Sequence, residues 1–371
     1  TAESLIESGD LNMIQDSVIL LKGARKYAFE KIVNALENKT HCTQLEINLE
    51  ALQHNLSYYR KIIGSKNKIM GMVKAQAYGA GAVEIAKILQ TQGIEYLTVA
   101  YTDEGVHLRN NGIYTPIMVM NPQVEEFDKM VSYALEPEIY NFSMLRAIDE
   151  YSNNQNKNIK IHIKLDTGMK RLGFEMNDIS DLIEELNQMP QLWVVSILSH
   201  LAASENPVHK EFTLQQISQF NEAAGAISDR LGYKPIWHIA NSAAIQNYPE
   251  ARMDMVRLGI SMYGISGNPT EKKALENVLT LKTYVSQVKN VKKGETVGYG
   301  RIGQFKEDGR IATLAIGYAD GYCRSLGNGE GLFEIQGQLC PTIGSICMDL
   351  CMVDISNIAE VNEGDEAIVF G

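Results

Sequence analysis

One stretch of sequence sets the pattern for most of the chain. Residues 68–100 read KIMGMVKAQAYGAGAVEIAKILQTQGIEYLTVA: an apolar run, a turn rich in small residues, an amphipathic segment and a second apolar run. Short apolar runs that alternate with segments of helical spacing predict parallel strands joined by helices. The stretch also places a lysine, Lys74, directly after its first predicted strand.

The same alternation continues to about residue 260. Amphipathic segments such as VEEFDKMVSYA (124–134) and DISDLIEELNQ (178–188) separate most of the apolar runs. The eight runs are KIMGMV (68–73), YLTVA (96–100), PIMVM (116–120), LEPEI (135–139), IKIHIKL (159–165), WVVSILSH (193–200), WHIAN (237–241) and MVRLGI (255–260). Eight strands that alternate with helices predict a closed (β/α)8 barrel of the TIM type. A doubly wound open sheet is the alternative, but its usual GxGxxG fingerprint is missing from this sequence.

The pattern changes at both ends of the predicted barrel. After about residue 277, short apolar runs and glycine-rich turns follow one another without a long helical segment, which predicts an all-β domain. We therefore expect a barrel at 41–276 and a β domain at 277–371. Because residues 365–371, DEAIVFG, end directly after an apolar strand, we expect the β domain to be incomplete. Residues 1–40 predict a separate segment, with a strand at 17–23 and an amphipathic helix at 25–39.

Composition excludes several classes of protein. Of the 371 residues, 45% are hydrophobic and 21% charged, which is ordinary for a globular protein with a large core. The net charge of −11 disfavours nucleic acid and anionic membranes as partners. No run approaches the roughly 18 apolar residues of a membrane helix, and the N-terminus has no secretory signal pattern. The five cysteines are irregularly spaced, which predicts reduced thiols in a cytoplasmic protein and neither a metal site nor a disulfide framework.

Polar groups gather where the predicted barrel strands end. Active groups of (β/α)8 barrels lie at the carboxyl ends of the strands, so these positions are expected to converge on a pocket. They are Lys74, Lys164, Asp166, Arg171, His200, Asn241, Ser242, Arg257 and Gly259. Each has a structural explanation by itself: a strand-end lysine, a core histidine, a helix cap or a buried arginine. All of them together are harder to explain without a functional site.

The turn after the first strand has a chemical interpretation. Lys74 becomes a nucleophilic amine if burial or neighbouring cations lower its pKa. Tyr78 is four residues further on and can reach a phosphate, while Gly79 and Gly81 permit positive φ or a close backbone approach. Asn241 and Ser242 stand at a strand-to-helix turn, where backbone amides bind phosphate.

Eight separated motifs together resemble the alanine racemase family, which uses pyridoxal 5′-phosphate and has fold type III. They are VKAQAYGAG (73–81), KLDTGMKRLGF (164–174), LSHLA (198–202), ANSAA (240–244), MVRLGISMYG (255–264), VGYGR (297–301), IGYADGY (316–322) and GSICMD (344–349). The resemblance covers the chain from about residue 41 to its end. It implies an isomerase that interconverts L-alanine and D-alanine and supplies D-alanine for the peptidoglycan of the cell wall.

The resemblance also implies a role for individual residues. Lys74 is the lysine that binds the cofactor covalently, Arg257 faces its pyridine nitrogen with His200 beside it, and Arg171 reaches its phenolic oxygen. The phosphate contacts are Tyr78, Asn241, Ser242, Gly259 and Ile260. Lys164 is a lysine that is carbamylated in many members and braces the arginine at position 171. On the substrate side stand Arg171, Met348 and Asp349, with Tyr318 and Arg324 in the corridor that leads to the site.

Racemisation explains why such residues are needed. The α-proton must leave one face of the amino acid and a proton must return to the other, so two acid–base groups stand on opposite faces. The resemblance assigns Lys74 to one face and Tyr299 to the other. Tyr299 is expected to come from the partner subunit, which makes a homodimer with shared active sites a requirement for activity.

Some features depart from this pattern or leave alternatives open. Residues 9–36 resemble the end of the Mur ligase that adds D-alanyl-D-alanine, which suggests a ligase–racemase fusion; a helical extension of the barrel is the alternative. Gln76, Lys170 and Ser345 replace the family's usual Asn or Asp, Gly and Arg, and a family tyrosine that contacts the cofactor phosphate falls after the last residue given. A serine or broad-specificity racemase, a decarboxylase of the same fold and a cofactor-binding barrel without turnover are the rival functions.

Overall fold

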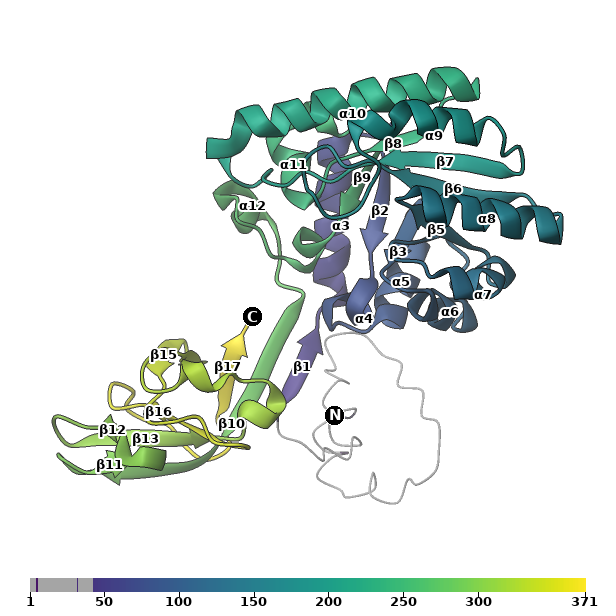
Figure 1. The fold of residues 1–371 in the computed structure, drawn as a ribbon. Coiled ribbons are helices and arrows are strands. Elements are labelled where there is room, and N and C mark those ends of the chain that lie inside the picture. Colours follow the sequence, from purple (N-terminus) through teal and green to yellow (C-terminus); the bar gives the residue numbers. More distant parts are fainter. Residues whose placement is uncertain (1–4, 6–31, 33–42) are drawn as a thin grey trace. The chain divides into compact units, whose positions relative to one another are not determined.

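The structure is a computed structural model, and it describes residues 43–371 together with the single positions Leu5 and Ile32. The predicted Mur ligase segment at residues 1–40 therefore lies outside the described residues, Leu5 and Ile32 aside. The chain divides into two compact units, with boundaries between Leu45 and Glu46 and between Thr280 and Leu281. One unit holds the barrel and the other the β-rich part of the chain (Figure 1).

The predicted barrel is confirmed, and all eight predicted strands belong to it. The strands are β2 (Lys68–Met72), β3 (Tyr96–Val99), β4 (Ile117–Val119), β5 (Leu135–Ile139), β6 (Ile159–Lys164), β7 (Leu192–Leu198), β8 (Ile236–His238) and β9 (Met255–Leu258). They form one parallel sheet in the order β8-β7-β6-β5-β4-β3-β2-β9. Backbone hydrogen bonds from Asp254 N to Trp237 O and from Arg257 N to Ala240 O join the two end strands. The sheet is thus closed into a ring.

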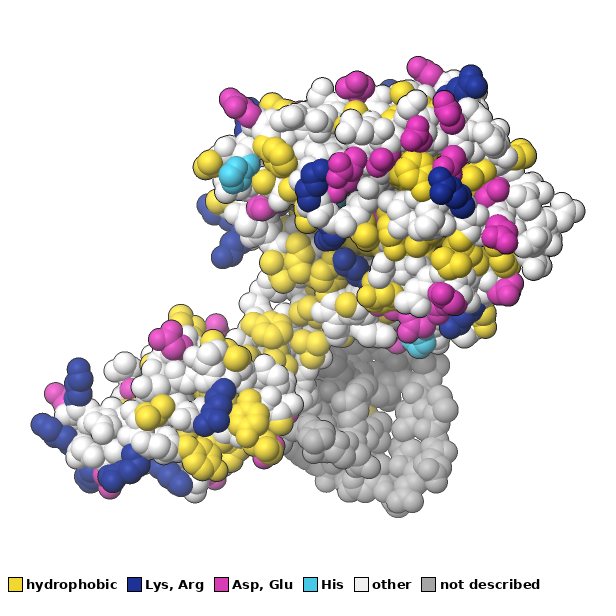
Figure 2. All heavy atoms as spheres, viewed as in Figure 1, with side chains coloured by type: hydrophobic (Ala, Val, Ile, Leu, Met, Phe, Trp, Pro, Cys, Tyr) yellow, Lys and Arg dark blue, Asp and Glu magenta, His cyan; other side chains and the backbone are white. Residues whose placement is uncertain are grey.

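Helices follow the strands, as the amphipathic segments predict. The α-helices are α3 (Leu49–Ile63), α5 (Ala82–Thr91), α6 (Thr102–Asn110), α7 (Phe127–Ser132), α8 (Phe142–Gln155), α9 (Ile179–Leu186), α10 (Lys210–Leu231), α11 (Ser242–Asn247) and α12 (Pro269–Ala274), and the short 3-10 turns are η3 (Val124–Glu126), η4 (Met176–Asp178), η5 (Pro207–His209), η6 (Pro249–Ala251) and η7 (Ile260–Tyr263). Asparagine side chains at 48, 141, 241 and 268 cap α3, α8, α11 and α12 by accepting backbone N–H groups of the first turn. Acidic and basic side chains are mixed over the outer surface of this helical layer (Figure 2).

Two kinds of side chain fill the inside of the barrel. Because neighbouring residues of a strand point to opposite faces, Met70 points inward while Ile69 packs under the helices. Met70, Tyr96, Met118, Leu198 and Met255 form an apolar cluster of their own. Several interior positions of β5 to β8 are polar instead: Glu136, His162, Ser196 and His238 are all buried.

The second unit is an antiparallel β structure, as predicted. Its strands are β10 (Leu279–Val291), β11 (Thr296–Val297), β12 (Gly303–Gln304), β13 (Gly309–Leu314), β14 (Leu332–Ile335), β15 (Gln338–Pro341), β16 (Cys351–Asp354) and β17 (Glu366–Phe370); β1 (Gln44–Ile47) precedes the barrel. The main sheet runs in the order β15-β14-β17-β10-β13-β16, and β11 pairs with β12. Val285, Phe333 and Val353 are among the residues of its apolar core. No helix in the described part of the chain is long and apolar enough to cross a membrane.

Candidate active site

A cavity of about 880 Å³ opens in the barrel unit, and the ends of several barrel strands meet there. Its walls include all nine residues that the sequence analysis assigned to cofactor binding: Lys74, Tyr78, Arg171, His200, Asn241, Ser242, Arg257, Gly259 and Ile260. These residues come from the ends of β2, β6, β7, β8 and β9. The structure therefore brings these nine residues together in one pocket, whereas Lys164 and Asp166, which were predicted with them, do not line it.

The turn that carries Lys74 has an uncommon backbone. In the segment Lys74–Tyr78 (labelled α4), the last four residues have φ between 51° and 59°, so they form a left-handed turn. Each non-glycine residue in this conformation costs about 1–2 kcal/mol, so tertiary contacts must hold the turn. Glu104 is such a contact: its Oε1 accepts the N–H of Ala75 at 2.6 Å and its Oε2 accepts that of Ala100 at 2.7 Å. Gly79 and Gly81 follow with φ of 91° and 85°, as expected from the sequence.

The left-handed turn delivers Tyr78 to a narrow cradle at Gly259. A β-carbon built on Gly259 would lie 2.9 Å from Tyr78 Oη and 3.7 Å from Ser242 Oγ, so a side chain at this position would displace the tyrosine hydroxyl. The N–H of Gly259 donates to Ser242 Oγ at 2.9 Å. The cradle thus combines two hydroxyl groups with a backbone that has no side chain, and Asn241 caps the helix that begins at Ser242.

The amine of Lys74 lies in a cationic environment. Burial lowers the pKa of Lys74, Arg171 lowers it further, and Glu104 and Glu138 act in the opposite direction. A lowered pKa raises the fraction of neutral amine, which is the nucleophilic form of lysine. The electrostatic setting therefore suits a lysine that attacks a carbonyl group.

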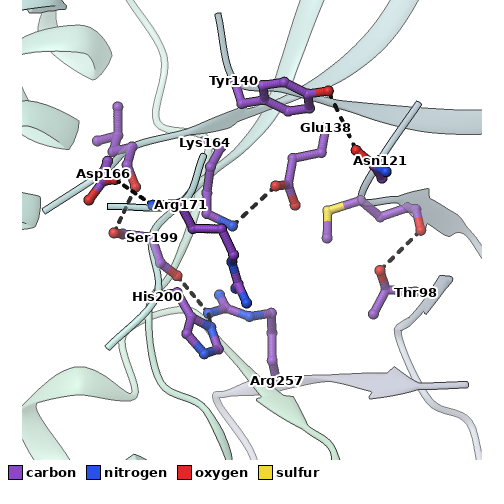
Figure 3. Close-up of polar contacts among 12 residues, drawn as sticks. Thr98, Asn121, Glu138, Tyr140, Lys164, Asp166, Arg171, Ser199, His200 and Arg257 are labelled. Atoms are coloured by element: carbon purple, nitrogen blue, oxygen red, sulfur yellow. Dashed lines mark hydrogen bonds and ion pairs between the residues drawn. The ribbon is translucent and has the colours of Figure 1, made fainter. Parts of the chain in front are cut away.

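Arg257 is a buried guanidinium that several acceptors hold in place. It donates to the backbone oxygens of Ser199, His238 and Ile239, and its Nη2 lies 3.3 Å from His200 Nδ1 (Figure 3). Burial lowers the pKa of Arg257 to about 10, so it stays charged near neutral pH. Burial and the charge of Arg257 lower the pKa of His200 to about 3, so this histidine is neutral. The predicted neighbourhood of Arg257 and His200 is present.

Lys164 has a partner that the sequence analysis did not identify. Its ammonium lies 3.1 Å from Glu138 Oε1, and both side chains are buried next to Arg171 and Arg257 (Figure 3). Burial lowers the pKa of Lys164, whereas Glu138 raises it. Asp166 positions Arg171 by accepting the backbone N–H groups of Gly168, Lys170 and Arg171. Lys170, where the family usually has glycine, has a φ of 54°.

The remaining predicted residues lie on the β unit. The side chains of Tyr299, Tyr318 and Met348 are 67%, 41% and 54% exposed, and Asp349 and Arg324 are exposed as well. Hydrogen bonds connect the segments that carry these residues. Ser345 Oγ donates to Tyr299 O at 3.3 Å, and the N–H of Ala319 donates to Met348 O at 3.0 Å. Tyr299 and Tyr318 begin the turns η8 (Tyr299–Arg301) and η9 (Tyr318–Asp320), and Arg324 begins η10 (Arg324–Leu326).

Sequence reasoning missed three acids with structural roles, of which Glu136 and Glu138 are buried and Glu104 is partly exposed. Glu104 holds the left-handed turn, Glu138 pairs with Lys164, and Glu136 binds His162 at 3.0 Å. A signal for two of them was present in LEPEI (135–139), because two glutamates two residues apart in a strand point to the same face. In a barrel strand covered by helices, that face is the interior, where acids need partners.

The fold and the pocket define a class of (β/α)8 barrel whose pocket carries a lysine of lowered pKa at the end of the first barrel strand. Two family models match the chain: the N-terminal domain of alanine racemase at residues 47–267 and its C-terminal domain at residues 278–371. The chain belongs to the alanine racemase family. Neither match includes residues 1–40.

Curated proteins and solved structures agree with this family. The alanine racemase of Clostridium tetani is 39% identical over 331 residues, which cover 88% of this chain and 85% of that protein. That of Methanococcus maripaludis is 38% identical over 337 residues, 90% of each chain. The structure of the alanine racemase from Clostridium difficile 630 has a TM-score of 0.81 at 35% identity and covers 90% and 87% of the two chains. A structure from Bartonella henselae, described as an alanine racemase with covalently bound pyridoxal phosphate, has a TM-score of 0.82 at 26% identity and covers 89% and 90%.

Proposed function

We propose that this chain catalyses the interconversion of L-alanine and D-alanine, with pyridoxal 5′-phosphate bound in the barrel pocket. The observation that carries the proposal is Lys74, an amine of lowered pKa at the end of β2 in a cavity lined by Arg171, Arg257 and the Gly259 cradle. The family and the named activity of its members support the same reaction.

The residues of the pocket fit this cofactor. A phosphate group needs donors around a backbone that permits close approach, and Tyr78 Oη and Ser242 Oγ flank Gly259, which has no side chain to cover its backbone. A pyridine nitrogen accepts a hydrogen bond, and Arg257 is a donor on every guanidinium nitrogen. Asn241, Ile260 and His200 complete the walls.

When bound, the cofactor withdraws charge from the α-carbon and makes its proton acidic. Lys74 would hold the cofactor and would act as the acid–base group on one face of the substrate. Arg257 would face the ring nitrogen as a charged donor that gives up its proton reluctantly, and this property would favour racemisation over transamination. Arg171 holds the phenolic oxygen and the substrate, and Lys164 with Glu138 fixes the charges behind it. The family resemblance assigns a carbamate to Lys164, which stays part of this proposal.

The second acid–base group is Tyr299 of the partner subunit. Tyr299 is two-thirds exposed on its own chain and is therefore free to enter a neighbouring site. The active assembly is a homodimer in which each pocket receives Tyr299, Met348 and Asp349 from the partner, with Tyr318 in the access corridor. Dilution below the dissociation constant of the dimer abolishes turnover if this is right.

The cellular role follows from the product. D-Alanine made in the cytoplasm supplies peptidoglycan biosynthesis. Residues 9–36 would then be the end of a Mur ligase that uses D-alanyl-D-alanine, joined to the racemase in one polypeptide. We predict no ligase activity from these residues alone.

Proton NMR of L-alanine in deuterated water tests the proposed reaction. With the chain and added cofactor, the Cα–H signal is expected to disappear while D-alanine forms, and Lys74→Ala is expected to do neither. Tyr299→Phe separates the two faces: exchange that continues without inversion identifies Tyr299 as the second acid–base group. A wild-type chain that loads the cofactor but exchanges no Cα proton would refute the function.

A further inference from the structure

A continuous chain of hydrogen bonds crosses the inside of the barrel from Arg257 to Glu136. Arg257 Nη1 lies 3.1 Å from His238 Nδ1, and His238 Nε2 lies 2.8 Å from Ser196 Oγ. Ser196 Oγ lies 2.6 Å from His162 Nδ1, and His162 Nε2 lies 3.0 Å from Glu136 Oε2. These five residues come from β9, β8, β7, β6 and β5, so the chain follows neighbouring strands around the barrel. We call it the interior relay.

The chemistry of the donors gives the relay one direction. A guanidinium has no acceptor, so His238 Nδ1 must accept from Arg257. A neutral imidazole carries one proton, so His238 Nε2 carries it and donates to Ser196 Oγ. Ser196 is fully buried and its hydroxyl needs an acceptor, which is His162 Nδ1. His162 Nε2 then carries the proton and donates to the Glu136 carboxylate.

Every hydrogen bond of the relay therefore points from the cation toward the anion. Arg257, His238, Ser196 and His162 are at most 3% exposed, and Glu136 is 7% exposed. In such a dry interior, hydrogen bonds that share a direction polarise one another and strengthen. Among the described residues, no carboxylate is directly hydrogen-bonded to Arg257. The relay thus connects the buried positive charge of Arg257 to the negative charge of Glu136, with which Arg257 is not in direct contact.

The anionic end is held as firmly as the cationic end. Glu136 also accepts from Tyr96 Oη at 3.1 Å, and Lys160 Nζ lies 3.4 Å from Glu136 Oε1. Burial by itself would raise the pKa of Glu136, but the hydrogen bond from His162, the charge of Lys160 and the hydrogen bond from Tyr96 outweigh burial, so its pKa lies below the usual value. The charge of Glu136 also acts on Arg109. A carboxylate that resists protonation is a poor destination for a proton that leaves Arg257 along the relay.

We infer that Glu136, His162, Ser196 and His238 are positioning residues that orient Arg257 and keep its proton in place. Their action on Arg257 stands on the geometry alone. Its consequence for catalysis, a low rate of transamination, rests on the proposed function, in which Arg257 faces the ring nitrogen of the cofactor. Two experiments separate these two parts.

The first experiment reads the protonation of the two histidines. Nitrogen-15 NMR of the cofactor-loaded protein, with labelled histidine and assignment through His162→Asn and His238→Asn, distinguishes protonated from bare ring nitrogens. Both histidines are expected to be neutral, with a proton on Nε2 and none on Nδ1. A proton on Nδ1 of either ring, or a doubly protonated ring at neutral pH, overturns the relay. This result does not depend on racemase activity, so it separates failure of the relay from failure of the proposed function.

The second experiment measures reaction specificity. Glu136→Gln keeps the shape of the side chain and removes its charge, and Ser196→Ala interrupts the relay at its centre. With alanine, the ratio of transamination to racemisation is expected to rise about fivefold or more in each variant, which corresponds to about 1 kcal/mol. Glu150→Gln is the control, because it makes the same change of side chain at an exposed position of α8 outside the relay; its ratio is expected to stay within about twofold.

A merely structural role predicts a different result. Loss of folded protein lowers both rates equally and leaves their ratio unchanged. Confirmed tautomers together with an unchanged ratio in both relay variants would therefore overturn the catalytic part of the inference.

Discussion

The two halves of the barrel interior are filled by different kinds of side chain, apolar in one half and polar in the other. In the half built by β2, β3, β4 and β9, Met70, Met118 and Met255 fill space through shape and dispersion. In the half built by β5 to β8, Glu136, His162, Ser196 and His238 are joined by hydrogen bonds that leave none of the connecting atoms without a partner. Tyr96 stands at the border, with its ring in the apolar cluster and its hydroxyl on Glu136.

The difference shows how function shapes a core. An apolar interior tolerates substitutions of similar volume, because no contact in it depends on a single atom. A polar interior is stable only when it is complete, since each missing member leaves a buried donor or acceptor unpaired. The polar half, which is stable only when every member is present, lies behind Arg257. This is the side of the pocket that holds a buried charge.

The largest effect is expected from Glu136→Leu. This change removes the acceptor of His162, Tyr96 and Lys160 together and leaves a buried guanidinium at the other end of the relay. We expect the free energy of unfolding to fall by about 3–5 kcal/mol, the loss that is typical when one partner of a buried charge system is removed. Urea denaturation measures it, and Glu150→Leu on the exposed face of α8 is the control. If Glu136→Leu and Glu150→Leu lowered the free energy of unfolding by the same small amount, the stability of the polar half would not depend on Glu136.

Met118→Ala is the matching change in the apolar half. Met118 is fully buried, and its truncation leaves a cavity but no unpaired polar atom. The expected loss is about 2–4 kcal/mol by the same measurement. The NMR signals of His162 and His238 should stay unchanged, since the two halves are held by separate contacts. A shift of both histidine signals in this variant would break the distinction between the halves.

The pH dependence of stability distinguishes the two halves, because buried histidines titrate and apolar side chains do not. The folded-state pKa values of His200 and His238 are lowered, chiefly by burial, whereas both histidines have ordinary values near 6.5 after unfolding. A depressed folded-state pKa contributes stability that is complete above pH 6.5 and is lost as the pH falls below it. Between pH 7 and pH 5.5 we expect a loss of about 1 kcal/mol for each histidine, or about 2 kcal/mol together.

Urea denaturation at the two pH values provides the test. Met118→Ala should lose the same amount on acidification as the wild type, because the apolar half has no group that titrates in this range. A stability that does not change between pH 7 and pH 5.5 would mean that both buried histidines accept protons in the folded state.

The smallest effect is expected from Ser196→Ala. The methyl group fits the space of the hydroxymethyl group, and only the bridge between His162 and His238 is lost. We expect the free energy of unfolding to fall by about 1–2 kcal/mol. Ser196→Thr is the matched control, because it keeps the hydroxyl group. A loss in Ser196→Thr as large as that in Ser196→Ala would assign the effect to packing.

Much of the fold could be predicted from the sequence because its periodicity is local. Each of the eight apolar runs overlaps a barrel strand, and Asn241 caps a helix as its position before Ser242 indicates. The barrel residues of the pocket converge because the ends of parallel strands meet at one rim. Motif spacing is sufficient for that conclusion.

The contacts that depend on tertiary structure could not be predicted in the same way. Ala75, Gln76 and Ala77 favour right-handed helix by local preference, yet all three are left-handed, and Glu104, 29 residues from Ala75, holds the turn. Glu138 and Lys164 meet across neighbouring strands, so their pairing requires the register of β5 and β6. LEPEI signals buried acids but does not name their partners.

The central claim is that Lys74 is the amine that binds the cofactor, and covalent trapping tests it most directly. Borohydride reduction of the chain loaded with pyridoxal 5′-phosphate, followed by peptide mass mapping, fixes the cofactor to the lysine that holds it. The account predicts one labelled peptide that contains Lys74, and no labelling of this peptide in Lys74→Ala. Label on Lys164 or on a surface lysine, with Lys74 unmodified, would contradict it.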